Sequence, residues 1–496
     1  MLDFYLPNFS LILPEIILAI TALGLLLDGV MTGAEKGVAV RRTAHVAILS
    51  MIVAGVFLGA SWQVDLRQVS FNGQFYLDNY VILTKILVLI GSSSALAMSL
   101  SNLQRSGIER FEFPILGLLA TLGMMVMLSS NDLLPLFMGL ELQGLSLYIL
   151  AGLSRDRLSV SEAALKYFVL GALSTGLFLY GVSLIYGFAG TTNFDTLTAV
   201  FRFGAVDGVS IGVVIGLVFV IASLAFKVST VPFHMWTPDV YQGAATPVTA
   251  FLASAPKIAA LALFLRLMMD PFQLLFEQWQ QILIVIAAGS MILGAFAALS
   301  QTDLKRLLAY SSIGQMGYAV MGIAAGTEEG ARGVILYMII YAAMIIGVFA
   351  CILHLKSRSR QTFNDISDLS GLSQSHPKLA FVLSTFMFSM AGIPPLAGFF
   401  GKLYIFMSAI EAGLTWLAIL GVLSSVVSAF YYLRIVKTIY FDALPETPLV
   451  MAGSGGAVAF ENTIVLNGAF LFTLLFCVYP QGLLRIVQEA VVALMN

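Results

Sequence analysis

Long apolar runs dominate the pattern of this chain, and only short polar stretches separate them. A helix needs roughly 20 apolar residues to cross the hydrocarbon core of a bilayer, and many of these runs reach that length. The longest polar stretch, 355–378, is too short to fold as a separate domain. We count fourteen candidate spans, near residues 11–28, 43–61, 78–100, 112–130, 132–152, 161–188, 208–235, 247–269, 279–300, 303–325, 331–355, 378–410, 413–440 and 462–484.

The pattern therefore predicts an all-α polytopic membrane protein that forms a single integral membrane domain over residues 1–496. We expect residues 1–111 to hold the first three spans and 441–496 to hold the last one. Residues 112–270 and 271–440 are expected to form two related five-helix units. The opening segment lacks the basic region of a secretory signal, so we expect it to remain in the mature chain.

Composition narrows the class of protein further. Charged residues make up 10% of the chain, whereas soluble globular proteins contain about 25%. The net charge of −2 gives no indication of a surface that binds nucleic acid. Cys351 and Cys477 both lie in apolar runs and are too few for a disulfide framework or an iron–sulfur site. No glycine-rich dinucleotide fingerprint follows a strand, so we expect no cofactor and no metal in this chain.

Basic residues are concentrated in the connections that follow odd-numbered spans. Lys36 and Arg41 follow the first span, and Lys305 and Arg306 follow the ninth. Because basic loops favour the cytoplasmic side of a membrane, this asymmetry predicts that both termini are periplasmic. The expected location is the inner membrane of a bacterium.

Five ionisable residues lie well inside the apolar spans: Glu141, Lys166, Lys227, Lys257 and Lys402. A charged side chain at the centre of a membrane helix costs about 2.5–3.5 kcal/mol on insertion scales, and such residues usually mark an ion path. Burial disfavours the charged forms of lysine and glutamate, so their charged and neutral forms differ less in free energy. This property suits proton exchange. We therefore expect a proton path.

Two further charges are expected to lie at the membrane interface rather than in the path. Lys85 is close to the outer end of the third span, where its long side chain can extend to the interface. Glu15, in the first turn of the first span, is expected to stay there as well.

Glu141 and Lys166 lie on consecutive predicted spans joined by a short loop. Such helices tend to pack antiparallel, so an ion pair between the two side chains is expected. The pair would either switch as a proton moves or serve as a static structural contact.

Two predicted spans contain helix-breaking sequences. The seventh carries Lys227, Pro232 and His234 within the stretch AFKVSTVPFHMW, and proline removes a backbone donor. The twelfth carries Pro394 and Pro395 in GIPPLAGFFGKLY, directly before Lys402. We expect both helices to be interrupted beside protein or a cavity, with His234 as a candidate proton relay.

The two broken spans are five apart, so spans 4–8 and 9–13 are expected to form two units of inverted topology, a common plan in transporters. On this reading Lys227 and Lys402 take matching positions in the two units. Lys257, in the eighth span, is expected to face the protein interior because a lipid-facing lysine is implausible.

Several stretches resemble the antiporter-like subunits of the proton-pumping NADH:quinone oxidoreductase, the bacterial respiratory complex I. The matching stretches are GLELQGLSLY, EAALKYF, AFKVSTVPFHMWTPDVYQGA, DLKRLLAYSSIGQMGY and GIPPLAGFFGKLY. Within that family the chain is most similar to the N type. The M type typically has glutamate where Lys402 stands, and the L type extends beyond the fourteenth span, whereas this chain ends at Asn496.

The resemblance implies a role for each buried charge. Glu141 would pair with Lys166, Lys227 would stand at the break of the seventh span, Lys257 would be the connecting lysine and Lys402 the terminal ionisable group. It also implies a division of labour. This chain would translocate protons, while NADH, flavin, iron–sulfur clusters and quinone (ubiquinone in many bacteria) would be bound by partner subunits.

The implied partners are the other membrane subunits of the complex, including other antiporter-like subunits, and the lipid bilayer. Two alternatives stay open from the residues themselves. The chain could be a subunit of a multi-subunit cation/proton antiporter, or a membrane scaffold whose buried charges only form structural pairs.

Overall fold

The computed structural model describes residues 8–32, 36–63, 67–100, 102–103, 109–154, 157–204, 210–356, 363–445, 448–451 and 460–495. The first half of the chain contains α1 (Leu13–Thr32), α2 (Lys36–Ala60), β1 (Gln68–Ser70), β2 (Phe75–Leu77), α3 (Asn79–Ser99), α4 (Glu112–Ser129), α5 (Leu133–Ala151), α6 (Leu158–Ala189), α7 (Phe194–Gly204), α8 (Ile211–Val228), α9 (Trp236–Gly243), α10 (Thr246–Ala253) and α11 (Ala255–Met269). Nearly all of it is helical.

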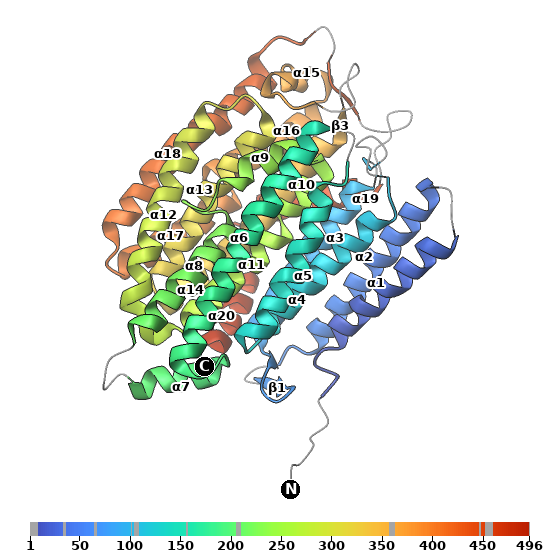
Figure 1. The fold of residues 1–496 in the computed structure, drawn as a ribbon. Coiled ribbons are helices and arrows are strands. Elements are labelled where there is room, and N and C mark those ends of the chain that lie inside the picture. The colour runs from blue at the N-terminus through green and yellow to red at the C-terminus, as the bar shows by residue number, and fades with distance from the viewer. Residues whose placement is uncertain are drawn as a thin grey trace.

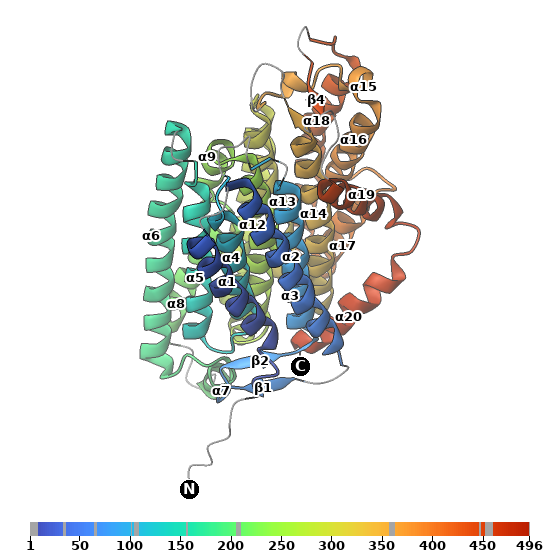
Figure 2. The same ribbon diagram turned by 90° about the vertical axis from the view of Figure 1, so that its right-hand side faces the viewer.

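The second half is also helical. It contains η1 (Gln273–Leu275), α12 (Phe276–Leu299), α13 (Leu304–Ala324), α14 (Glu328–His354), β3 (Leu355–Lys356), η2 (Ile366–Leu369), α15 (Leu372–Ser375), α16 (Pro377–Ala391), α17 (Ala397–Glu411), α18 (Thr415–Phe441), β4 (Val450–Met451), α19 (Phe460–Leu475) and α20 (Gln481–Met495). Most of the long helices run roughly side by side (Figures 1 and 2).

The helices have the length and apolar character that a membrane requires. Within the described residues, eleven helices are long and apolar enough to cross a bilayer, and α16 and α19 are shorter apolar helices. The all-α, multi-pass membrane fold is therefore confirmed, while the count of fourteen spans stays a prediction. One detail differs at the end of the chain, because the expected last span is divided near Pro480 into α19 and α20.

One end of the helix bundle carries the β1–β2 hairpin, α7 and the C-terminal end of α20, and we call it the hairpin face (Figures 1 and 2). The two strands pair antiparallel, with Val69 opposite Tyr76. The end of α4 joins this face, because Asn131 donates to the Gln74 carbonyl at 2.8 Å. The other end of the bundle, which carries α15 and the β3–β4 pair, is the opposite face.

Helices α4 and α12, which begin the two expected five-helix units, run in opposite directions. The chain enters α4 from the opposite face, whereas it enters α12 after Asp270, from the hairpin face. Each is packed closely on the next helix. A Cβ atom on Gly123 of α4 would stand 2.5 Å from the Gln143 nitrogen of α5, and one on Gly294 of α12 would stand 2.5 Å from the Gly314 nitrogen of α13. Small residues permit such close helix contacts in membranes.

Both expected helix breaks are present. Helix α8 ends at Val228 and α9 begins at Trp236, while α16 ends at Ala391 and α17 begins at Ala397. The Val231–Pro232 and Pro394–Pro395 peptide bonds, one in each break, are cis.

The expectation that Lys85 and Glu15 lie at the interface is wrong. Lys85 is 0% exposed and forms a short ion pair with Glu15 of α1, which is also buried. The ammonium also lies 4.9 Å from the centre of the Phe75 ring. Both side chains are buried, because α1 and α3 bring a carboxylate and an ammonium together inside the bundle, where they form an ion pair.

This pair predicts an asymmetric mutational response. Lys85→Met leaves the Glu15 carboxylate buried without a partner, so we expect a loss of about 3–5 kcal/mol of stability. The double change Glu15→Gln with Lys85→Met removes both charges and should lose much less. The measurement is the thermal midpoint of the assembled membrane protein.

Lys437→Met is the matched control, because Lys437 pairs with Asp442 at 2.9 Å on the surface and is largely exposed. We expect it to change the midpoint little, since exposed ion pairs contribute little to stability. Equal losses for Lys85→Met and Lys437→Met would contradict a structural role for the buried pair.

Candidate proton path at two helix breaks

Lys257 donates hydrogen bonds to the end of the helix at the first break. Helix α8 ends at Val228, and the next residue, Ser229, has a positive φ of 66°. The Thr230 amide donates back to the Ala225 carbonyl at 2.9 Å. The Lys257 ammonium, from α11, donates to the Val228 carbonyl at 3.0 Å and forms a short bond with the Ser229 hydroxyl. Lys257 is only 2% exposed. A buried carbonyl freed by the break thus receives a charged donor.

Lys402 does the same at the second break. Helix α16 ends at Ala391, and the next residue, Gly392, has a φ of 86°. The Ile393 amide donates to the Phe388 carbonyl at 3.1 Å. The Lys402 ammonium, 4% exposed, donates to the Met390 and Ala391 carbonyls at 3.0 and 3.3 Å. It also donates to the Ser425 hydroxyl at 2.8 Å.

The two breaks are therefore built alike, but not with the lysines that the sequence suggested. Their backbone bonds align Ser229 with Gly392, so Lys227 corresponds to Met390 and not to Lys402. The groups that take the same place are the ammonium ions of Lys257 and Lys402. The expected match of Lys227 with Lys402 is wrong because the first lysine precedes its break, whereas the second follows its own.

Glu141 lies near Lys227 and not beside Lys166. Among the residues that the structure describes, no ion pair joins Glu141 to Lys166. The Thr175 hydroxyl donates to the Glu141 carboxylate at 2.6 Å, and that carboxylate attracts the Lys227 ammonium electrostatically. A Cβ atom on Gly144, one turn along α5, would stand 3.3 Å from the Lys227 Nζ. The Glu141 carboxylate of α5 therefore belongs with the lysine of α8.

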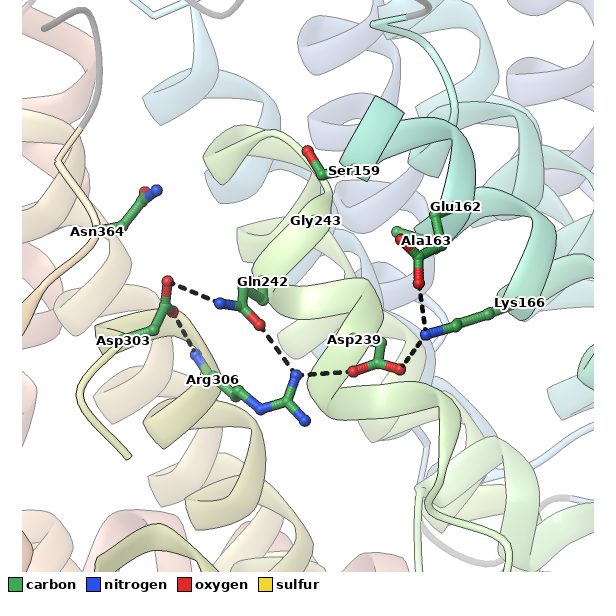
Figure 3. Close-up of a pocket in the computed structure, with 10 residues that line it drawn as sticks. All are labelled: Ser159, Glu162, Ala163, Lys166, Asp239, Gln242, Gly243, Asp303, Arg306 and Asn364. Carbon is green, nitrogen blue, oxygen red and sulfur yellow. Dashed lines mark hydrogen bonds and ion pairs between the residues drawn. The ribbon is translucent and has the colours of Figure 1, made fainter. Parts of the chain in front are cut away.

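Lys166 lines a polar pocket of about 410 Å³ instead (Figure 3). Its Nζ lies 2.7 Å from Asp239 of α9 and 2.8 Å from Glu162, one turn back on α6. Arg306 of α13 pairs with the other oxygen of Asp239 at 2.7 Å and donates to Gln242 at 2.9 Å. Asp239 was not predicted as a site residue and Arg306 was expected in a loop, because nothing in either local sequence indicates this contact.

Aromatic rings separate this pocket from the buried lysines. Tyr167, adjacent to Lys166, stacks on Trp236 with ring centres 4.5 Å apart and meets Tyr148 edge-on at 4.7 Å. Lys257 lies 5.5 Å from the Trp236 ring centre, and Lys227 lies 5.9 Å from that of Tyr148. The ring faces attract these cations and place an apolar layer between them and the pocket.

Buried polar side chains along α13 reach the second break. Ser312 accepts from Tyr341 at 2.9 Å, and Ser311 shares a 2.5 Å hydrogen bond with Tyr432. Gln315 donates to Tyr432 at 3.0 Å and to the Met390 carbonyl at 3.4 Å, the carbonyl that also accepts from Lys402. Hydroxyls and amides of this kind can relay protons between fixed groups.

His234 lies within the first break, as its position beside Pro232 requires. It is half-buried, and its Nδ1 atom is buried without a hydrogen-bond partner among the described residues. Pro232 itself is exposed. Among the described residues, no group of three or more histidine, cysteine, aspartate or glutamate side chains is arranged to hold a metal ion.

Fold and site together define a polytopic membrane protein of the antiporter-like class, with buried lysines at interrupted helices. The family model described as NADH:quinone oxidoreductase/Mrp antiporter, transmembrane, matches residues 130–428. NADH-quinone oxidoreductase subunit N of Parvibaculum lavamentivorans is 51% identical over 99% of this chain and 98% of that protein. Subunit N of Rhodospirillum rubrum is 52% identical over 97% and 96%. The chain belongs to the subunit N family of NADH-quinone oxidoreductase.

Solved structures agree with this assignment. A chain of respiratory complex I from Thermus thermophilus is 31% identical, with a TM-score of 0.79, over 95% of this chain and 99% of that one. A chain of the Mrp complex from a Dietzia species shares the fold, with a TM-score of 0.81, at 20% identity over 99% and 98% of the two chains.

The second break predicts a position where alanine is not tolerated. Gly392 has a positive φ, and a Cβ atom there would stand 3.2 Å from the Lys402 Cδ. A residue with a side chain pays about 1–2 kcal/mol for this backbone conformation. Gly392→Ala should therefore lower the thermal midpoint of the assembled protein.

Gly176→Ala in α6 is the control, because a Cβ atom there meets nothing within 4 Å. Alanine favours the helix, so the midpoint should stay level or rise slightly. A fall of the same size in both variants would show that the conformation of Gly392 is not what limits the substitution.

Proposed function

We propose that this chain is a proton-translocating subunit in the membrane arm of an NADH:quinone oxidoreductase. The single observation that carries the proposal is the placement of two buried ammonium groups, Lys257 and Lys402, on the carbonyl ends of two interrupted helices. Buried lysines in a membrane are expensive and usually functional. The family membership supports the link to electron transfer from NADH to quinone.

Proton occupancy of each lysine is coupled to the state of its helix break. A protonated Lys257 holds the Val228 carbonyl, and a protonated Lys402 holds the Ala391 carbonyl. When either ammonium gives up its proton, it loses a donor and its charge, so the carbonyl is held less strongly. Movement at the break and movement of a proton therefore favour one another.

The charged residues of the spans take different places in this scheme. Glu141 and Lys227 form the first acid and base, and their attraction depends on where the proton resides. Lys257 follows across the break, and the polar side chains of α13 lead to the Met390 carbonyl, which also accepts from Lys402. Lys166 stands apart in the polar pocket with Asp239, near the opposite face. His234, with its unpaired nitrogen, is an additional relay beside Pro232.

The energy for transport comes from other chains. We propose that partner subunits hold the flavin, the iron–sulfur clusters and the sites for NADH and quinone, and that this chain binds no cofactor of its own. Its neighbours are the other membrane subunits, antiporter-like ones among them, and lipid. We further propose the bacterial inner membrane as its location, with residues 1–111, 112–270, 271–440 and 441–496 as its parts and the hairpin face periplasmic.

A second candidate function is cation/proton antiport, which the description of the matching family includes. The two functions differ in the ion that moves and in the source of energy. Transport that requires sodium, and proceeds without NADH, would favour antiport. Transport of protons that stops when NADH oxidation stops would favour the redox-driven complex.

The central prediction separates proton transfer from scaffolding. Glutamine keeps a hydrogen-bond donor for the carbonyl but does not exchange a proton, so Lys257→Gln and Lys402→Gln should preserve assembly and abolish most pumping. The measurement is proton translocation by membrane vesicles, normalised to the rate of NADH oxidation.

Lys437→Gln is the control for charge removal alone, since Lys437 lies at the surface beside Asp442. It should pump normally. Normal pumping by a fully assembled Lys257→Gln or Lys402→Gln complex would contradict the proposed role of that lysine and support a scaffold.

A further inference from the structure

A second group of buried charges lies at the hairpin face, outside the lysine series. Asp78 stands at the start of α3, with its Oδ1 accepting from the Val81 amide at 2.7 Å. Arg266 is in the last turn of α11, and Asp270 follows that helix. Arg266 is 3% exposed, and its guanidinium lies 3.4 Å from the centre of the Tyr76 ring. The group joins α3 and α11 beneath the β1–β2 hairpin.

The carboxylates of Asp78 and Asp270 both lie near the single guanidinium of Arg266. Arg266 donates to Asp270 at 3.2 Å, whereas its Nη1 atom lies 3.7 Å from Asp78, beyond hydrogen-bond distance. A buried carboxylate needs a full partner, so one guanidinium cannot neutralise both. The group therefore carries one negative charge in excess while both carboxyls are ionised.

The other cations nearby are already paired. Arg67, which approaches the Tyr76 ring at 5.2 Å, lies 2.7 Å from Asp195. Lys85, two turns along α3 from Asp78, forms its own pair with Glu15. On α20, which packs against α3, Arg485 and Glu489 lie 3.1 Å apart. The Tyr80 hydroxyl donates to the Ala262 carbonyl at 2.6 Å. None of these pairings neutralises the excess charge of the group.

Polar atoms in the same group have no hydrogen-bond partner. Among the described residues, Arg266 Nε, Arg266 Nη1 and the Tyr76 hydroxyl are buried and unpaired. Buried polar atoms are rarely left in this state. Asp270 is more exposed than Arg266, because its side chain is 18% exposed and that of Arg266 only 3%. Asp270 therefore gives the group its contact with the surface, whereas Asp78 is 4% exposed.

We propose that Asp78 and Asp270, held by Arg266, form a proton-binding site at the hairpin face that is separate from the lysine series. A proton bound to Asp78 removes the excess charge and leaves Arg266 to pair with Asp270. The site binds its proton whether or not Lys257 and Lys402 carry the transport described above.

The electrostatic environment of Asp78, which lies just outside the span of α3, supports the same conclusion. Burial raises the pKa of the Asp78 carboxyl to about 7, and the Asp270 carboxylate adds to the rise. The Val81 amide and Arg67 oppose it but are outweighed. Asp78 would then change its protonation state in the neutral range, where a group that exchanges protons with the medium is most effective.

The experiment is an infrared titration of the intact membrane complex across the neutral pH range, following the carbonyl stretch of protonated carboxyl groups. Subtracting the spectra of Asp78→Asn from those of the unmodified complex isolates one residue. We expect a carboxyl that titrates near neutral pH in the unmodified complex and is missing in Asp78→Asn. Asparagine resembles the protonated acid, so this variant should assemble.

Two further variants test the geometry. Asp270→Asn removes the competing carboxylate, so the midpoint of Asp78 should shift to lower pH without the signal disappearing. Asp442→Asn, at the end of α18 and paired with Lys437, should leave the midpoint unchanged. If Asp78→Asn failed to assemble, the shift in Asp270→Asn would decide.

Three results would overturn the proposal. The first is an assembled Asp78→Asn complex whose titration in the neutral range equals that of the unmodified complex. The second is an Asp270→Asn midpoint that does not move. The third is a signal that follows sodium concentration at constant pH, which would make the group a cation site. Loss of pumping in the lysine variants with this titration intact would separate the two proposals.

Discussion

The structure depends on one constraint: within an apolar slab, every carbonyl freed from a helix and every buried charge must find a partner inside the protein. An unbroken helix meets this demand by its own hydrogen bonds, and most of the chain is built that way. Helices α8 and α16 do not, because each ends partway through the bundle. Their last carbonyls are held by Lys257 and Lys402, so the most costly residues of the chain sit where the backbone most needs donors.

This arrangement makes the same groups structural and functional. A static donor such as serine would satisfy a carbonyl equally well, but it would not respond to proton occupancy. A lysine holds the break strongly when charged and weakly when neutral. The two breaks share backbone geometry, and their lysines come from different elements, α11 in one case and α17 in the other. The equivalence therefore concerns the position of the ammonium group and not the position in the sequence.

The buried charges of the chain fall into different classes once their neighbours are known. Glu15 and Lys85 form a closed pair within the α1–α3 packing, with no route to water in the described contacts. Lys166, Asp239 and Arg306 line the polar pocket and are partly exposed. Glu141, Lys227, Lys257 and Lys402 lie deeper, with aromatic and hydroxyl side chains between them.

The amino-acid sequence predicts the membrane fold, the two helix breaks and the identity of the charged residues, because apolar length and proline act locally. It also carried the family resemblance through its motifs. It did not determine which charges meet. The proposed partner of Glu141, the interfacial place of Lys85 and the match of Lys227 with Lys402 were all wrong, and Asp239 and Arg266 were overlooked. Each of these depends on how helices far apart in the chain pack side by side, and only the tertiary structure decides those distances.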